Sequence, residues 1–117
     1  MVSNLKSIVM DLENTKAQMR KGILEYCILS VISRGSSYAS NIIRELKEAK
    51  VIVVEGTLYP LLTRLKNSGL LSYRWEESQQ GPPRKYYELT VQGKDYIADL
   101  DKSWDELVES VNMIRTR

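Results

Sequence analysis

The chain has 117 residues, 43% of them hydrophobic, so its length suits one domain with a modest core. It contains no histidine and one cysteine, which removes the commonest general base, the commonest zinc ligand and any disulfide within the chain. No apolar run approaches the ~20 residues that cross a bilayer, and the first residues do not resemble a secretory signal. The composition therefore predicts a cytoplasmic protein with no catalytic residues, no cofactor, no metal site and no membrane partner.

The formal net charge of +2 is unevenly distributed along the chain. Residues 15–90 carry 12 Lys and Arg against 7 Asp and Glu, whereas residues 91–114 carry 2 against 6. A basic body followed by an acidic segment indicates that one face of the molecule meets a polyanion while another face stays away from it.

The first third of the sequence predicts helices. In residues 1–14 apolar residues recur at helical spacing, and this N-terminal extension is expected to be either helical or disordered. Thr15, with Gln18 three residues later, matches a capping box, in which each side chain satisfies a backbone N–H at the start of a helix. The first full helix is therefore expected from Thr15 to about Arg34. It contains the lone cysteine, Cys27, in an apolar stretch where the thiol is expected to be buried and inert.

Two further helices are expected before the middle of the chain. The second is capped by Ser36 or Ser37 and continues to about Ala49. Residues 51–54 are all β-branched and are expected to form an extended connector. A third helix is expected over residues 56–68, because its leucines recur at intervals of three and four residues and form one apolar stripe. These leucines are Leu58, Leu61, Leu62 and Leu65.

After Gly69 the sequence pattern changes from helical to alternating. Residues 71–76 and residues 85–89 each alternate between two faces, and the segment between them is rich in Gly, Pro and Gln. Two alternating runs around such a loop predict a β-hairpin. Thr90 then caps a last helix that is expected to reach about Ile114.

This order predicts a mainly α fold with a small β-hairpin: a winged helix-turn-helix domain over residues 15–90 and a long C-terminal dimerisation helix over residues 91–117. In such a domain the third helix enters the major groove of DNA, and the hairpin, called the wing, reaches the flanking backbone or the minor groove. The outer face of the third helix and the wing carry hydroxyl, amide and basic side chains suited to phosphates and base edges. These candidate DNA-contacting residues are Thr57, Tyr59, Thr63, Arg64, Asn67, Arg84 and Lys85.

Plainer interpretations of these side chains stay open. Each basic residue taken singly is equally well explained as a solvated charge, and only the whole set on this topology favours DNA. The aromatic residues of the hairpin are expected to pack within the hairpin rather than to stack on bases. They are Tyr73, Trp75, Tyr86 and Tyr87.

The last helix carries the pattern of a coiled-coil seam. Its apolar residues are separated by three, four, three, four and three positions, which favours pairing with a second copy of the chain. The alternative is that the seam packs onto its own domain, but a helix of more than 20 residues outreaches a domain this small. The predicted dimer-interface residues are Ile97, Leu100, Trp104, Leu107, Val111 and Ile114.

Three sequence segments closely resemble the PadR family of transcriptional regulators. They are Glu55–Leu65 (EGTLYPLLTRL), Gly69–Leu71 (GLL), and Gly81–Thr90 (GPPRKYYELT) with Gly93. The resemblance extends over residues from about 15 to 114, and the single C-terminal helix is similar to the short branch of the family. Residues 1–11 precede the usual start of the family.

The resemblance implies a cytoplasmic repressor that binds double-stranded DNA, is usually homodimeric, and is sometimes released from DNA by a small aromatic compound. It adds Ser37 and Tyr38, at the start of the second helix, to the residues expected to contact DNA. It also makes Trp104 a candidate ligand-binding residue, since some members of the short branch hold planar compounds between tryptophans. The equally open alternative is a closed hydrophobic seam in which Trp104 is only a large core residue. Two other functions stay open: a winged-helix module for protein interactions, and a small-molecule-binding protein without DNA binding.

Overall fold

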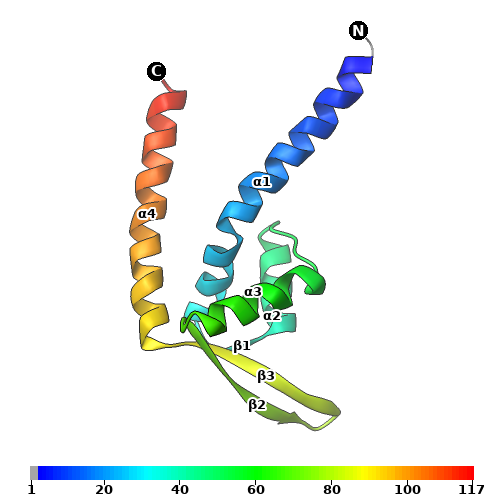
Figure 1. Ribbon diagram of the computed structural model, residues 1–117, viewed down its shortest axis with the longest axis vertical. Coiled ribbons are helices and arrows are strands. Elements are labelled where there is room, and N and C mark those ends of the chain that lie inside the picture. The colour runs from blue at the N-terminus through cyan, green and yellow to red at the C-terminus, as the bar shows by residue number, and fades with distance from the viewer. Residues whose placement is uncertain (1–2) are drawn as a thin grey trace.

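The computed structural model describes residues 3–117, with side chains from residue 11 onward, as four helices and a three-stranded antiparallel sheet (Figure 1). In chain order the elements are α1 (Ser3–Ser33), β1 (Ser37–Tyr38), α2 (Ala39–Glu48), α3 (Glu55–Asn67), β2 (Leu71–Ser78), β3 (Gly81–Leu89) and α4 (Val91–Arg115). The predicted mainly α fold, with a hairpin and a long last helix, is confirmed. Within residues 3–117 no helix combines the length and apolarity needed to cross a bilayer.

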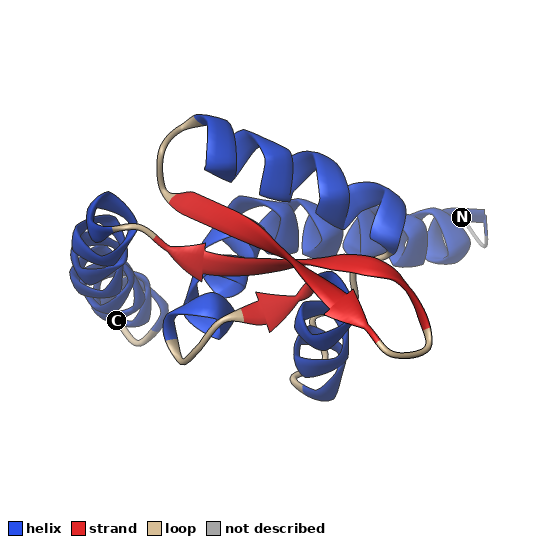
Figure 2. Cartoon of the chain, turned by 90° about the horizontal axis from the view of Figure 1, so that it is seen from below, coloured by secondary structure: helices blue, strands red, loops and turns tan. Residues whose placement is uncertain are grey.

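One hydrophobic core joins the first three helices to the sheet. Its fully buried side chains come from the middle of α1 (Ile28, Leu29), from α2 (Ile42) and from the leucine stripe of α3 (Leu58, Leu62). The strands lie in front of the helices in the view from below, with order β1-β3-β2 (Figure 2). Burial of this stripe turns the opposite face of α3 toward solvent.

The start of α1 differs from the prediction. Thr15 does not cap a helix, because α1 begins at Ser3 and runs through this position without interruption. The Thr15 hydroxyl instead donates a hydrogen bond to the carbonyl of Asp11, 3.0 Å away, as threonine does inside helices. The first part of the predicted 1–14 extension is thus helical from residue 3, while residues 1 and 2 lie outside the described residues.

The predicted serine cap of the second helix is also wrong. Ser37 and Tyr38 are extended and form β1, which pairs with Tyr87 and Tyr86 of β3. Helix α2 begins one residue later, with Tyr38 at its N-cap position and the Tyr38 N–H donating to the side chain of Asn41. The sheet therefore has a third strand that the sequence pattern did not predict.

The junction between the hairpin and α4 is fixed by local hydrogen bonds. The Thr90 hydroxyl accepts from the N–H of Gly93 at 3.0 Å and donates to the carbonyl of Gly69 at 2.6 Å, so the predicted cap of α4 is confirmed. Gly69 has a φ of +83° and ends α3 in a Schellman turn. A Cβ at position 93 would collide with the carbonyl oxygen of Leu70, so this close approach requires glycine.

Polar and aromatic contacts join α1 to α4 above the core. The Tyr26 hydroxyl donates to the carboxylate of Asp101, and the Tyr26 ring centroid lies 6.2 Å from that of Trp104. The bond to Asp101 is the largest cause that raises the pKa of Tyr26 to about 12. The neighbouring Cys27 is half-buried, and its burial raises the pKa of the thiol, which keeps it protonated.

The Tyr26 hydroxyl predicts a specific alkaline loss of stability. Its pKa is higher in the folded state than the ordinary value of about 10, so its stabilising contribution is complete below pH 10 and is lost as pH rises toward 12. Tyr26→Phe is expected to lower the free energy of unfolding at pH 8 and to remove this part of the alkaline decline. Urea unfolding of both proteins between pH 8 and 12 measures the difference, and parallel curves throughout would contradict the assigned hydrogen bond.

Candidate nucleic-acid interface

Helix α3 presents a polar face to solvent. Leu58, Leu62 and Leu65 are buried beneath it, and the residues on the other side of the helix are exposed. All five predicted DNA-contacting residues of this helix are among the exposed ones: Thr57, Tyr59, Thr63, Arg64 and Asn67. A helix with an anchored apolar stripe and a polar outer face has the form needed to enter a major groove.

The wing, residues 71–89, places basic side chains beside α3. Strands β2 and β3 form the predicted hairpin, with Tyr73 opposite Tyr87 and Trp75 opposite Lys85. The Lys85 ammonium lies 4.5 Å from the ring centroid of Tyr73 and 5.4 Å from the Trp75 ring. These cation–π contacts hold the Lys85 side chain on the face of the hairpin that is turned toward α3.

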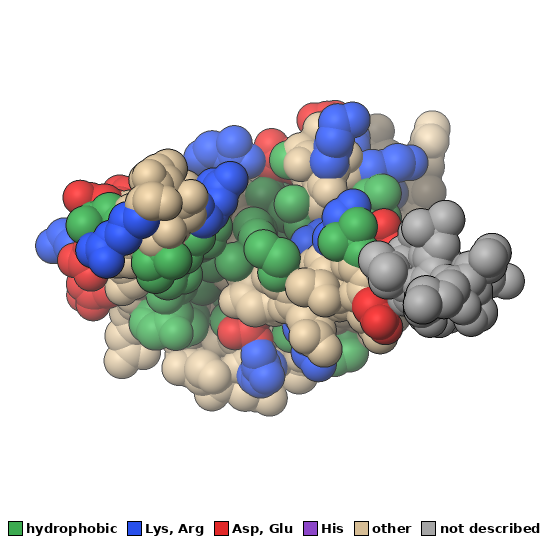
Figure 3. Space-filling model, turned by 90° about the horizontal axis from the view of Figure 1, so that it is seen from above, with side chains coloured by type: hydrophobic (Ala, Val, Ile, Leu, Met, Phe, Trp, Pro, Cys, Tyr) green, Lys and Arg blue, Asp and Glu red, His purple; other side chains and the backbone are tan. Residues whose placement is uncertain are grey.

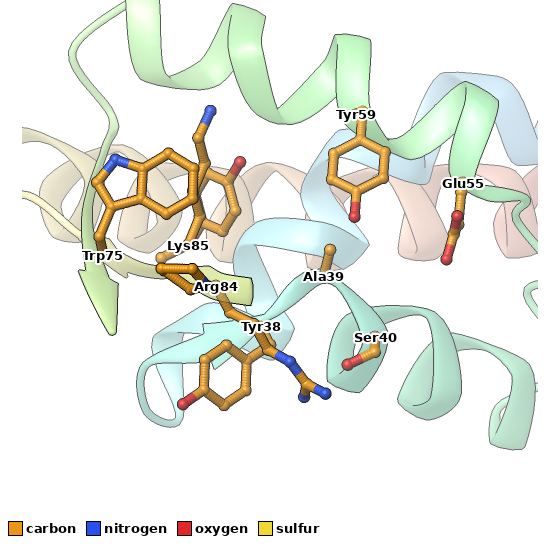
Figure 4. Close-up of a pocket in the computed structure, with 10 residues that line it drawn as sticks. Tyr38, Ala39, Ser40, Glu55, Tyr59, Trp75, Arg84 and Lys85 are labelled. Carbon is orange, nitrogen blue, oxygen red and sulfur yellow. The ribbon is translucent and has the colours of Figure 1, made fainter. Parts of the chain in front are cut away.

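A cavity of about 370 Å³ lies between α3, the start of α2 and the wing (Figure 4). Tyr59 points into this space from α3, while Arg84 and Lys85 enter it from the wing. The remaining lining residues are Tyr38, Ala39, Ser40, Glu55, Trp75, Pro83 and Tyr87. The fold thus brings four of the predicted contact residues to one concave, basic and aromatic surface, although they lie up to 47 positions apart.

Tyr38 connects the start of α2 to the wing. Its hydroxyl donates to the carboxylate of Glu76 at 2.7 Å, and its ring lies 4.7 Å from that of Tyr86. The Arg84 guanidinium lies 5.5 Å from the same ring. The hydrogen bond to Glu76 is the main cause that raises the pKa of Tyr38. Tyr38 therefore links the start of α2 to both strands of the wing.

A smaller cavity of about 100 Å³ lies where the C-terminal half of α3 meets the wing. It brings Thr63 and Asn67 close to Lys85. Lys66 also lines it, with its ammonium 5.8 Å from the Tyr73 ring.

Three predicted residues stand apart from both cavities. Ser37 is buried, and its hydroxyl donates to the carbonyl of Gly35 at 3.2 Å. Arg64 forms an ion pair with Glu25 of α1, on the flank of α3 away from the wing. Thr57 is exposed in the first turn of α3 but lines neither cavity.

Several residues that line the two cavities are absent from the predicted contact set, although the sequence predicts that Trp75 packs within the hairpin. They are Ser40, Glu55, Lys66, Trp75 and Pro83. For Trp75 a signal was present, because the alternation of residues 71–76 places it on the same face as Tyr73, and the register of the hairpin then sets it opposite Lys85. Within the described residues no group of three or more His, Cys, Asp or Glu side chains is arranged to hold a metal ion.

A second surface lies between α1 and α4, away from the wing. Ile97 and Leu100 of the predicted seam pack against the core of their own chain, but the rest of the seam does not. Trp104, Leu107 and Ile114 are 38%, 56% and 72% exposed. A cavity of about 580 Å³ lies between α1 and α4, with Met19 and Ile23 on the α1 side and Trp104, Leu107, Val108 and Val111 on the α4 side. Figure 3 shows hydrophobic side chains gathered in the hollow between these two helices.

Comparison with known proteins places this geometry among regulators. The family model described as the transcriptional regulator PadR-like family matches residues 28–99. A PadR-like transcription factor from Bacteroides fragilis is 63% identical to the chain, with 86% of this chain and 98% of that chain covered and a TM-score of 0.74. A PadR family regulator from Eggerthella lenta DSM 2243 is 27% identical, covers 93% and 96% of the two chains, and has a TM-score of 0.86.

A third similar structure is that of PadR from Bacillus subtilis, solved in complex with operator DNA. It is 26% identical, with 67% of this chain and 46% of that chain covered and a TM-score of 0.62. The region that matches the family model begins in the buried part of α1 and includes both cavities beside the wing.

Proposed function

Since the chain belongs to the PadR-like family of transcriptional regulators, we propose that it is a cytoplasmic, homodimeric repressor that binds operator DNA through α3 and the wing. The observation that carries this proposal is the cavity in which Tyr59, Arg84 and Lys85 converge from separate elements. Basic side chains suit phosphates, while the outer face of α3 offers hydroxyl and amide groups for base edges. The operator complex of the Bacillus subtilis protein supports the same mode of action here.

The homodimer is proposed to form through the exposed apolar residues in the second half of α4. Trp104, Leu107, Val111 and Ile114 repeat the three-four spacing of a coiled coil and are exposed in the single chain. A contiguous apolar surface on a projecting helix marks an interaction site. A two-fold dimer would present two copies of α3 and would read a pseudo-palindrome whose half-sites lie about 10 base pairs apart.

The proposal is tested by selecting genomic fragments that the protein retains at 0.15 M salt. A regulator enriches a few sites that share a two-fold motif, and its affinity for them falls steeply with salt because phosphate contacts release counterions. A protein-interaction module with this fold would enrich no motif. A selected site upstream of a gene whose transcription increases when the regulator is deleted would establish repression.

Substitutions on α3 are expected to separate base reading from backbone binding. Thr57→Ala and Tyr59→Phe should each weaken binding to the selected operator by roughly 1–3 kcal/mol if a base contact is lost, and relax discrimination at one base pair. Tyr96→Phe is a matched control, since Tyr96 is 46% exposed on α4 and Tyr59 is 47% exposed on α3. Unchanged affinity and specificity in both α3 variants would contradict the docking of α3 in the major groove.

We also propose an effector site beside Trp104 for a planar aromatic compound. The indole lines the apolar cavity between α1 and α4, and offset stacking on it contributes roughly 0.5–1.5 kcal/mol beyond burial. Such a ligand would release DNA only if it favoured one spacing of the two α3 helices over another. In the Trp75→Phe variant Trp104 is the sole tryptophan, so its fluorescence should be quenched by a binding compound. A panel of planar aromatics that leaves this emission unchanged at tens of micromolar would contradict the site.

A further inference from the structure

Trp75 is unusually exposed for its position in the hairpin. Leu71 and Tyr73 precede it on the same face of β2, and Leu71 is 2% exposed beneath the helices. Tyr87, opposite Tyr73 on β3, is 3% exposed. Trp75, one step further along the strand, is 60% exposed. The apolar face of the wing thus extends beyond the part that the helices cover, and it ends at the exposed indole of Trp75.

The surroundings of this indole are basic and ordered. The Trp75 ring meets the Tyr73 ring edge to face, with centroids 6.2 Å apart and an interplanar angle of 87°. The Lys85 ammonium lies 5.4 Å from the Trp75 ring, and Trp75 lines the same cavity as Tyr59 and Arg84 (Figure 4). The apolar indole of Trp75 beside the cations of Arg84 and Lys85 suits a partner in which apolar and anionic groups alternate.

The sugar–phosphate backbone of DNA is such a partner, because deoxyribose carbons alternate with phosphates along it. A helix in the major groove and a wing in the adjacent groove have one backbone strand between them, since that strand is what separates the two grooves. The cavity that contains Trp75 lies between α3 and the wing. The DNA backbone strand would therefore pass through this cavity when α3 and the wing both bind their grooves.

We infer that Trp75 packs on deoxyribose of the backbone strand that crosses between α3 and the wing, with Arg84 and Lys85 at adjoining phosphates. The inference rests on the proposed DNA-binding function and assigns Trp75 a direct contact in it. The contact is independent of base sequence, so it contributes affinity and orientation rather than discrimination.

Affinity measurements test this assignment. Trp75→Ala should weaken binding to the selected operator and to a scrambled duplex by the same factor, about tenfold, through loss of buried apolar area. The salt slope should stay unchanged, because no charge is removed. Ile52→Ala is the control, since Ile52 is an apolar side chain 71% exposed on the loop between α2 and α3. If Trp75→Ala lowers affinity for the operator alone, Trp75 contacts bases. If it reduces the salt slope, Trp75 acts by positioning Lys85. Either result would overturn the inference.

A spectroscopic measurement observes the contact without removing it. The protein labelled with 5-fluorotryptophan has two tryptophan signals in its ¹⁹F spectrum, and the spectrum of Trp75→Phe assigns them. Both duplexes should shift the Trp75 signal. Duplex binding by fluorescence anisotropy with an unshifted Trp75 signal would overturn this inference and leave the proposed function standing. A protein that binds no duplex at all would overturn both.

Discussion

Leu107→Glu is expected to convert the proposed dimer into monomers at micromolar concentration. The Leu107 side chain is 56% exposed in the single chain, so the substitution leaves the core of that chain intact. In a paired seam the same carboxylate would be buried without a partner, which costs several kcal/mol. Light scattering measures the mass, and circular dichroism confirms that the helices are retained. The monomer should also bind the operator more weakly, because each molecule then contacts one half-site.

Lys102→Glu is the matched control for this experiment. It places a glutamate on the same helix, but on the face opposite the seam, where the side chain is exposed. A variant with this change should remain dimeric. A Leu107→Glu protein that keeps the dimer mass would show that α4 is not the interface and would transfer the proposal to another surface.

The fold follows from the sequence wherever the pattern is long. The structure contains three features that the sequence predicts from several residues at once. They are the leucine stripe of α3, the alternation of the hairpin and the cap of α4 at Thr90. Short local signals were less informative. Thr15 has a capping pattern that an uninterrupted helix also accommodates, and the two residues of β1 are too few to show any period.

The candidate site depends on contacts between residues far apart in the chain, which local sequence patterns do not predict. The alternating pattern predicts that Trp75 shares a face of β2 with Leu71 and Tyr73 and packs within the hairpin, but Trp75 is 60% exposed, because exposure depends on how far α3 extends over the sheet. The sequence predicts that Arg64 contacts DNA, yet in the structure it pairs with Glu25 of α1, 39 positions away. Tyr38 and Glu76 likewise meet only because β1 adds to the sheet.

The double variant Arg84→Ala, Lys85→Ala is expected to weaken binding to every duplex, operator or not, by about 10- to 100-fold at 0.1 M salt. Removing two phosphate contacts should reduce the slope of log affinity against log salt concentration by up to about two. Arg84 is exposed and Lys85 is half-buried against Tyr73 and Trp75, so the effect on folding should be small. The thermal midpoint of the variant measures that effect separately.

The control removes the same formal charge from elsewhere on the protein. Lys94 and Lys102 are exposed on α4, within the acidic segment that is expected to stay away from DNA. If general attraction to a polyanion dominated, the double variant Lys94→Ala, Lys102→Ala would reduce affinity and salt slope as much as the wing variant does. If local phosphate contacts dominate, the wing variant alone changes the slope, because counterions are released only where a cation meets the backbone. Equal slopes for the two double variants would contradict the assignment of the wing as the backbone-binding element.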